Sequence, residues 1–188
     1  MTAAALGGVR WGRLTAHADE RGSFREVWKR STYPLLDENS TGRTDAAFVQ
    51  ANISASAVGV LRGMHYHRRQ LDHWIVLSGR AFVALVDVKA AAAGRGHAAI
   101  ETRELAADET VSIPVGVAHG FLALEPLQLM YLVTNEYDGT DELGFAWDDP
   151  AVGIRWPTVD GMTPILSARD KRNPTLRELF VTLSGSTL

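Results

Sequence analysis

Hydrophobic and polar residues follow the two-residue period of β-strands along most of the chain. From residue 48 to residue 55 the two classes alternate without interruption, and residues 81–88 form the nearly continuous apolar run that is typical of a buried strand. Glycine, proline and small polar residues separate these segments. On the same grounds, strand-like segments are predicted at residues 11–14, 23–28, 58–61, 74–77, 110–113, 121–124, 127–133 and 154–157.

Helical spacing is confined to the C-terminal part of the chain. Leu176, Leu179, Phe180 and Leu183 recur at intervals of three and four residues, which is the spacing of one helix face. Thr175 directly precedes them and stands where an N-cap residue would. Many short strands, frequent turn signals and little helix together predict an all-β sandwich or barrel.

Chain length and composition indicate a single domain. The chain has 188 residues, of which 46% are hydrophobic, and this is enough for one substantial core but little for two. Loops are predicted at residues 31–46, apart from a helical turn that the pattern allows around residue 35, and at residues 90–96. Neither loop is typical of a domain linker, so residues 1–188 are expected to form one domain.

Charge and residue usage exclude several functional classes. The net charge of −3 implies no basic surface for nucleic acid, and the absence of cysteine excludes disulfides, thiolate catalysis and cysteine-bound zinc. No apolar run approaches the ~20 residues that a membrane helix needs. Residues 1–9 are apolar but too short and uncharged for a signal peptide. We therefore expect a soluble, cytoplasmic protein without nucleic-acid or membrane partners.

Polar side chains concentrate at residues 59–79, inside sequence that is otherwise typical of a buried sheet. This segment contains three histidines and three arginines. Because polar groups in a buried strand are costly unless they pair or react, the segment is the first candidate for a functional site. His65 and His67 are two residues apart and would point to the same side of a strand. A solvated turn explains Arg68 and Arg69 equally well.

Arg62 and His65 raise a question of strand geometry. Their positions differ by three, so in a regular strand the two side chains would point to opposite faces. Both can face one pocket only if the strand contains a bulge between them. Gly63 stands where such a bulge is expected.

The alternating segment at residues 48–55 has two chemically distinct faces. Val49, Ala51 and Ile53 form an apolar face, whereas Gln50 and Asn52 lie on the other. Two carboxamides on one face suit the solvent side of a sheet. They also suit a pocket that hydrogen-bonds a ligand, because amides both donate and accept.

Short motifs follow one another in a characteristic order along the chain. They are Asp19-x-Arg21-Gly22-x-Phe24-x-Glu26, Gln50-x-Asn52, Gly59-Val60-Leu61-Arg62-Gly63-Met64-His65-Tyr66, Ile113-Pro114-x-Gly116-x-Ala118-His119-Gly120-Phe121, Tyr131 with Tyr137, Trp147-Asp148-Asp149-Pro150, Trp156-Pro157 and Leu166-Ser167-x-x-Asp170. With this order and spacing, from about residue 19 to residue 176, the chain resembles the dTDP-4-dehydrorhamnose 3,5-epimerase family of cupins. The resemblance implies a cupin jelly roll (double-stranded β-helix) with a few short helices, a homodimer, and a dTDP-linked 4-keto-6-deoxyhexose as substrate. It implies no cofactor and no metal.

The expected chemistry is proton removal beside a ketone. Inverting such a carbon needs a base on one face, an acid on the other, and donors or positive charge around the enolate oxygen. By resemblance, His65 is the base, Asp170 holds its imidazole in the useful tautomer, and Tyr131 is the acid. His119 and Arg62 match groups around the sugar and the enolate. Taken alone, His119, Tyr131 and Asp170 would each suit a structural role, so these assignments depend on the resemblance.

The remaining motif residues match a nucleotide and sugar pocket by the same resemblance. Arginine pairs with phosphate oxygens, a phenylalanine ring can stack on thymine, and amides can read the edge of the base. The residues expected here are Arg21, Phe24, Glu26, Gln50, Asn52 and Tyr137.

Three features depart from the family pattern. His67 stands where the family has glutamine, Asp72 where it has a lysine that steadies the enolate, and Lys89 with an alanine run replaces Arg-x-x-Ser-Pro-Thr-Phe-Gly. A carboxylate about 4 Å from an enolate would cost ~4 kcal/mol at an effective dielectric near 20, or nearly a thousandfold in rate. We therefore expect Asp72 to turn away, to pair with Arg62 or His67, or to bind a cation. His73 has the opposite parity and is a candidate to replace the lysine.

Two other functions remain open at this point. His65, His67, Asp72 and His119 follow the ligand spacing of metal-binding cupins, and three histidines with one carboxylate suit iron, manganese, nickel or zinc. A metal-dependent isomerase or oxygenase is therefore the first alternative, although His65 cannot be both a free base and a ligand. A non-catalytic sugar-nucleotide binding protein is the second, and the presence of both His65 and Asp170 speaks against it.

Overall fold

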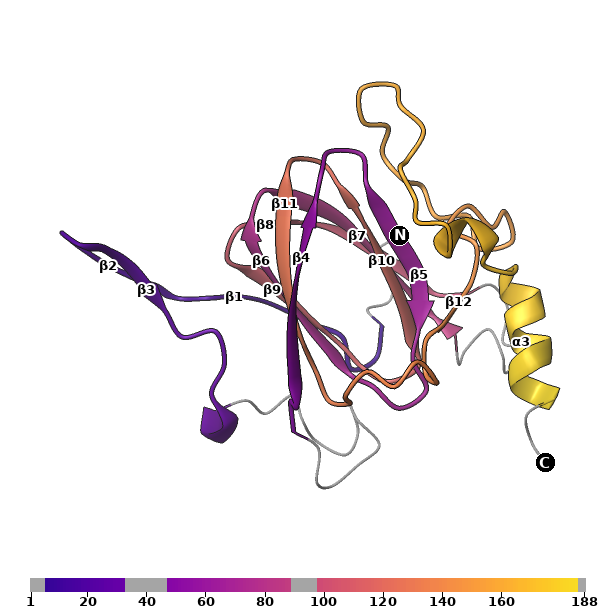
Figure 1. Ribbon diagram of the computed structural model, residues 1–188, viewed down its shortest axis with the longest axis horizontal. Coiled ribbons are helices and arrows are strands. Elements are labelled where there is room, and N and C mark those ends of the chain that lie inside the picture. Colours follow the sequence, from indigo (N-terminus) through magenta and orange to yellow (C-terminus); the bar gives the residue numbers. More distant parts are fainter. Residues whose placement is uncertain (1–5, 33–46, 89–97, 186–188) are drawn as a thin grey trace.

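The computed structural model describes residues 6–32, 47–88 and 98–185, and its strands form two antiparallel sheets that face each other (Figure 1). The first sheet has the order β1 (Arg10–Arg13), β9 (Glu109–Ile113), β6 (Asp72–Ser78), β11 (Leu127–Val133) and β4 (Gln50–Ser56). The second has the order β12 (Leu143–Gly144), β5 (Leu61–Tyr66), β10 (Val117–Ala123), β7 (Arg80–Asp87) and β8 (Ile100–Ala106). The all-β architecture that the sequence predicts is therefore present.

Apolar side chains from both sheets fill the space between them. Trp74 and Val76 of β6 belong to this core together with Val83 and Leu85 of β7. Each pair is separated by one residue, so a strand turns every second side chain toward the opposite sheet. Trp74 packs edge-on against Phe121 of β10, with ring centroids 5.7 Å apart. The core thus fixes the spacing of the two sheets next to the polar pocket described below.

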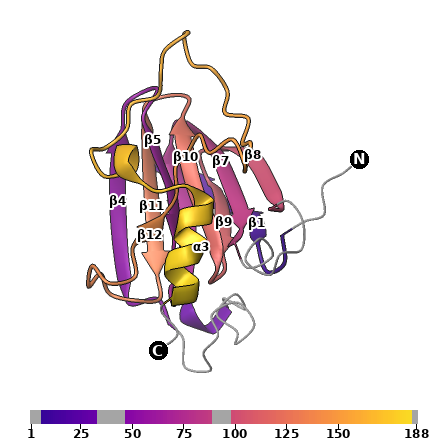
Figure 2. The same ribbon diagram turned by 90° about the vertical axis from the view of Figure 1, so that its right-hand side faces the viewer.

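Helix α3 (Leu176–Gly185) covers the outer face of the second sheet (Figure 2). Leu176 and Leu179 are buried there in a cluster that includes residues of β7 and β10. The Thr175 hydroxyl accepts a hydrogen bond from the backbone N–H of Glu178 at 3.3 Å, and the Glu178 carboxylate accepts one from the Thr175 N–H at 2.7 Å. This reciprocal capping box confirms the predicted N-cap.

Among the described residues, no helix combines the length and apolar character that crossing a bilayer requires.

A separate hairpin projects away from the two sheets. It consists of β2 (Ala16–Asp19) and β3 (Gly22–Arg25), which pair only with each other (Figure 1). The ring of Phe24 is 68% exposed at this arm. The prediction that the strand continues to residue 28 is wrong, because β3 ends at Arg25 and a short 3-10 helix, η1 (Arg30–Thr32), follows.

The strand predicted at residues 154–157 is also absent. This segment packs as irregular chain: Trp156 lies edge-on against Phe82 of β7 with centroids 5.7 Å apart, and its indole N–H donates to the Trp147 carbonyl at 2.9 Å. Strand β8 was not predicted from the sequence, because four of its seven residues are polar or charged and it lies at the edge of its sheet. The loop predicted at residues 90–96 and most of the one at 31–46 lie outside the described residues.

Candidate active site

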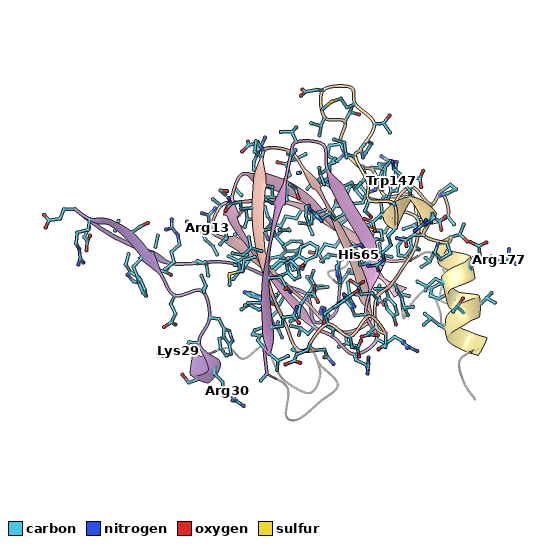
Figure 3. The ribbon with its side chains drawn as sticks, viewed as in Figure 1. Arg13, Lys29, Arg30, His65, Trp147 and Arg177 are labelled. Carbon is cyan, nitrogen blue, oxygen red and sulfur yellow. The ribbon has the colours of Figure 1, made fainter. Side chains whose placement is uncertain are left out.

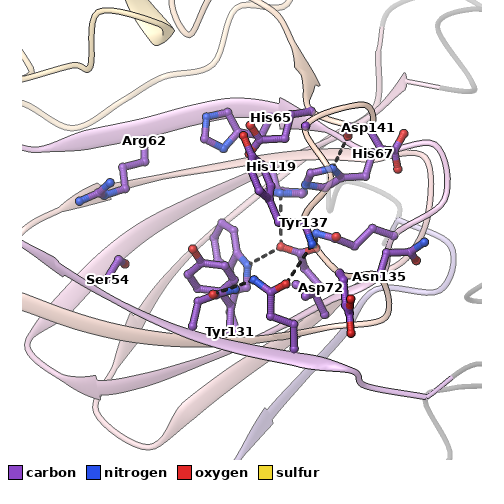
Figure 4. Close-up of a pocket in the computed structure, with 18 of the residues that line it drawn as sticks. Ser54, Arg62, His65, His67, Asp72, His119, Tyr131, Asn135, Tyr137 and Asp141 are labelled. Atoms are coloured by element: carbon purple, nitrogen blue, oxygen red, sulfur yellow. Dashed lines mark hydrogen bonds and ion pairs between the residues drawn. The ribbon is translucent and has the colours of Figure 1, made fainter.

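A cavity of ≈ 480 Å³ is lined by strands of both sheets. Its walls come from β4, β6 and β11 of the first sheet, from β5 and β10 of the second, and from the segments at residues 135–142 and 167–170. A cavity of this size with many polar groups is the expected form of a small-molecule site. Figure 4 shows the side chains that converge in it.

His65 and Asp170 meet at this cavity. His65 Nε2 lies 2.9 Å from Asp170 Oδ1, and Asp170 begins the short 3-10 helix η2 (Asp170–Arg172). Burial raises the pKa of Asp170, but hydrogen bonds from His65, Ser167 and the Gly63 backbone outweigh it and bring the pKa below its usual value. The carboxylate is therefore charged and accepts the Nε2 proton. This leaves His65 Nδ1 as the nitrogen that can take up a proton.

The strand that carries His65 contains the predicted bulge. His65 pairs with His119 and Arg62 pairs with Phe121, so β5 takes three steps where β10 takes two. Gly63 has a φ of +133°, and a Cβ at this position would lie 2.6 Å from the backbone of β10. Only glycine fits this conformation at this approach. The bulge turns both Arg62 and His65 toward the cavity, which confirms the prediction.

Strand β4 turns its polar face inward. Gln50 and Asn52 both line the cavity, and Gln50 Nε2 donates to Asn52 Oδ1 at 2.9 Å. Gln50 Oε1 accepts a hydrogen bond from the backbone N–H of Tyr137 at 2.9 Å, which connects β4 to the segment at residues 135–142. The apolar face points outward, where Val49 is 53% and Ile53 is 63% exposed. The structure thus favours the pocket interpretation of the two carboxamides over the solvent one.

Tyr131 lines the cavity from the wall opposite to His65. It lies on β11 of the first sheet, whereas His65 lies on β5 of the second, and Figure 4 shows the two on opposite sides. Burial, helped by the negative charge of Asp72, raises the pKa of the Tyr131 phenol. The phenol therefore carries its proton at neutral pH. An imidazole nitrogen that can take up a proton and a phenol that carries one consequently face each other across the cavity.

Asp72 lies beside two histidines and away from Arg62. One ligand atom from each of His67, Asp72 and His119 lies within 4.8 Å of the others; Asp72 and His119 are buried, and His67 is nearly so at 8% exposure. Asp72 Oδ2 is 3.7 Å from His119 Nε2. Burial lowers the pKa of His119 to about 4, although the Asp72 charge acts in the opposite direction. His73 faces the other side of β6, where its Nδ1 lies 2.6 Å from Ser112 Oγ, so it does not replace the lysine.

Three of the expected binding residues are not brought to this cavity by their own chain. Arg21, Phe24 and Glu26 lie on or next to the projecting hairpin, and Arg21 pairs there with its neighbour Asp19. Figure 3 shows the arm extending away from the sandwich in which His65 lies. The same chain therefore supplies the sugar end of the expected site but not this part of the nucleotide end.

Sequence reasoning missed an ion pair at the rim of the cavity. Arg169 Nη1 donates to Glu142 Oε2 at 2.6 Å, and its Nη2 donates to the Glu142 carbonyl at 3.2 Å. Both residues line the cavity. The only signal in the sequence is that Arg169 directly precedes Asp170, and nothing there points to Glu142.

Comparisons with known proteins agree with this geometry. Residues 3–178 match the family model described as dTDP-4-dehydrorhamnose 3,5-epimerase. A spore coat polysaccharide biosynthesis protein of Bacillus subtilis, SpsL, is 34% identical over 81% of this chain and 97% of its own. The dTDP-4-dehydrorhamnose 3,5-epimerase of Salmonella typhimurium is 33% identical over 87% of this chain and 88% of its own.

Solved structures show the same fold. The RmlC epimerase of Mycobacterium tuberculosis superimposes with a TM-score of 0.80 at 32% identity, covering 98% of this chain and 92% of the other. RmlC of Legionella pneumophila, solved in complex with dTDP-4-keto-L-rhamnose, superimposes with a TM-score of 0.77 at 28% identity, covering 94% of each chain. The two facing sheets are therefore the expected cupin jelly roll. By its sequence match and its structure, the chain belongs to the dTDP-4-dehydrorhamnose 3,5-epimerase family.

Proposed function

We propose that the protein is an isomerase that inverts C3, C5 or both carbons of a dTDP-linked 4-keto-6-deoxyhexose. The observation that carries the proposal is the His65–Asp170 pair on one wall of the cavity with Tyr131 on the other. The Legionella relative binds dTDP-4-keto-L-rhamnose, which supports a substrate of this class. A non-catalytic sugar-nucleotide binding protein would need no base and acid on opposite walls of its cavity.

The first step removes a proton next to the C4 ketone. His65 Nδ1 takes the proton, and the electron pair of the broken C–H bond forms the C=C bond of an enolate, with its charge on the C4 oxygen. Asp170 stabilises the imidazolium that results, because its carboxylate already accepts the Nε2 proton. Such a positioned base contributes about 10²–10⁴-fold to the rate.

The second step returns a proton to the opposite face of the same carbon. The Tyr131 O–H donates it, the C=O bond forms again, and the configuration at that carbon is inverted. Because the pKa of Tyr131 is raised, the phenol stays protonated until it donates its proton to the carbanion. The phenolate then regains a proton from solvent and the imidazolium of His65 loses one, so the enzyme returns to its starting state.

Arg62 supplies a fixed positive charge on the wall that carries the base. Its Nε donates to Ser56 Oγ at 3.2 Å and its Nη2 donates to the Ala55 carbonyl at 3.3 Å. These bonds hold the guanidinium at the cavity. A guanidinium placed there before the reaction stabilises negative charge that develops on the sugar.

We further infer a homodimer in which the hairpin of one copy completes the site of the other. A two-stranded hairpin is at best marginally stable alone, so the exposed arm formed by β2 and β3 is expected to pack against another surface. Strand β4 is an edge strand with the exposed apolar residues Val49 and Ile53 on its outer face. Its inner face carries Gln50 and Asn52. A partner hairpin on this edge would bring an aromatic ring next to these carboxamides.

The dimer also accounts for the nucleotide end of the site. Arg21, Phe24 and Glu26 of the partner copy would reach the cavity that their own chain does not offer them. Arginine suits the diphosphate, and the 68% exposed ring of Phe24 suits stacking on thymine. The site is then shared between two chains.

Proton NMR in D₂O tests the proposed reaction. Purified protein is mixed with dTDP-4-keto-6-deoxyglucose, and deuterium is expected to enter C3, C5 or both. His65→Asn should abolish exchange while dTDP still binds, whereas Arg177→Gln on α3 should exchange at the wild-type rate. Exchange that persists in His65→Asn would contradict the base assignment, and wild-type protein that binds dTDP without exchange would overturn the proposed function.

A further inference from the structure

Three side chains gather at one end of the cavity, and neither proton-transfer step proposed above uses them. His67 follows β5, Asp72 begins β6 and His119 lies on β10, so three separate parts of the chain meet here. One ligand atom of each lies within 4.8 Å of the others. Figure 4 shows the cluster at the end of the cavity opposite to Arg62.

Hydrogen bonds fix the tautomer of both histidines. His67 Nδ1 lies 2.6 Å from the carbonyl oxygen of Asp141, and His119 Nδ1 lies 3.2 Å from that of Val117. A carbonyl only accepts, so each Nδ1 carries the hydrogen and donates it. Each Nε2 is left with a lone pair, and such an Nδ1–H···O=C bond is how proteins orient histidines that ligate metals.

The carboxylate of Asp72 is held in place from its outer side. Gln70 Nε2 donates to Oδ1 at 2.8 Å, and Trp74 Nε1 donates to Oδ2 at 3.1 Å. Asp72 Oδ2 is also the oxygen that lies 3.7 Å from His119 Nε2. Two imidazole lone pairs and a carboxylate therefore converge in a buried place, and such acceptors repel each other unless positive charge lies among them.

We propose that His67, Asp72 and His119 bind one divalent transition-metal ion. Two imidazole nitrogens and one carboxylate oxygen are a common ligand set for zinc or iron, and this set leaves coordination positions open for a substrate oxygen. His65 is not part of it: its Nε2 is bonded to Asp170, and the three ligand atoms that lie within 4.8 Å of one another come from the other residues. The ligand set of four residues that the sequence allowed is thus corrected to three, and the ion and the free base no longer exclude each other.

The ion would restore positive charge at the position where this chain has Asp72 in place of lysine. A carboxylate alone would oppose an enolate, whereas a divalent ion bound to it gives the cluster a net positive charge that stabilises the enolate oxygen. This role rests on the proposed epimerase function. The binding of the ion does not, so the two can be tested separately.

Zinc content is the first measurement. The protein is equilibrated with zinc(II), freed of excess metal, and analysed by mass spectrometry of the elements. About one zinc per chain is expected for the wild type, and Asp72→Asn and His67→Gln should bind zinc at least ~10-fold more weakly, since even supporting residues of such sites contribute that much. His17→Gln, which removes an exposed histidine on β2, and His65→Asn should both retain the metal.

Cobalt(II) provides a readout that does not depend on variants. Cobalt bound by the cluster should give the visible absorption bands of a nitrogen- and oxygen-ligated ion, and zinc should displace it and raise the Tm of the wild type. Wild-type protein that shows no such bands and binds no stoichiometric zinc would overturn the metal site. A proton would then balance the negative charge of the cluster.

The metal site and the proposed reaction fail in different ways. Protein that exchanges the sugar protons but takes up no zinc would overturn the metal site and leave the epimerase intact. Protein that binds zinc through His67 and Asp72 but exchanges no sugar proton would support the site and overturn the proposed reaction.

Discussion

His65 Nε2 lies 2.9 Å from Asp170 Oδ1, although 105 residues separate the two in the chain. The bulge at Gly63 turns His65 into the cavity, and η2 delivers Asp170 behind it with its carboxylate buried. The proposed base therefore has one ring nitrogen held by a charged partner, and the other ring nitrogen remains able to take up a proton. Most of the predictions below depend on this arrangement and on the opposing position of Tyr131.

Asp170→Asn should lower the rate of proton exchange by ~100-fold or more, because an amide can hold the imidazole in the wrong tautomer. The affinity for dTDP should stay within about twofold of the wild type, since Asp170 contacts His65 and not the expected nucleotide end. NMR exchange rates and calorimetric titration with dTDP measure the two effects. An equal loss of dTDP binding would show that the substitution disrupts the cavity as a whole.

Tyr131→Phe should separate exchange from inversion. His65 still removes and returns a proton on its own face, so deuterium enters the sugar from D₂O, but the opposite face has lost its donor. Formation of the epimer should fall about 100-fold, the lower end of the contribution of a positioned acid. Both quantities come from the same NMR time course. Unchanged inversion would mean that another group donates the proton.

Ile53→Asp should convert the proposed dimer into a monomer. The Ile53 side chain is 63% exposed on the outer face of β4, and a charge buried under a partner hairpin is strongly unfavourable. Val181→Asp is the matched control, because Val181 is 69% exposed on α3 and remote from β4. Light scattering coupled to size exclusion gives the mass of each variant. A dimeric Ile53→Asp protein would place the interface elsewhere.

Mixing two impaired variants, with substrate below the weakened affinity of Phe24→Ala, tests whether the site is shared. Phe24→Ala should weaken dTDP binding by ~5- to 150-fold, from a loss of about 1–3 kcal/mol in base stacking. In a mixed dimer with His65→Asn, one of the two sites combines an intact His65 with an intact Phe24 of the partner copy. Activity should therefore reappear when the two proteins are unfolded and refolded together. No recovery, with mixed dimers present, would place Phe24 and His65 at the same site of one chain.

The His65–Asp170 pair should also make the fold sensitive to acid. Hydrogen bonds lower the pKa of Asp170 in the folded protein relative to about 3.9 in the unfolded chain, so Asp170 contributes stability above that pH. This contribution is lost as the pH falls through the folded pKa. The difference in unfolding free energy between wild type and Asp170→Asn should therefore shrink below about pH 4. Urea unfolding at pH 7 and pH 3 measures it.

Local sequence was sufficient for features whose physics is local. Alternation over residues 48–55 predicted β4, and the threonine before the periodic leucines predicted the capped start of α3, because strand period and N-caps depend on near neighbours. Gly63 predicted the bulge for the same reason. The strand expected at residues 154–157 is absent. This segment is held by the packing of Trp156 on the sheet and not by pairing with another strand.

The sequence by itself determined the all-β class, most of the core strands, the capped helix, the family and the residue types of the candidate site. Only the tertiary structure decided which face of β4 turns inward, because alternation defines two faces and not which one is covered. It gave the 2.9 Å contact between His65 and Asp170 that the resemblance had only implied, and it separated His65 from His67, Asp72 and His119, since distances between remote segments arise from sheet register and packing. It also showed that the hairpin of β2 and β3 lies away from the cavity of its own chain, which the spacing of residues along the sequence could not indicate.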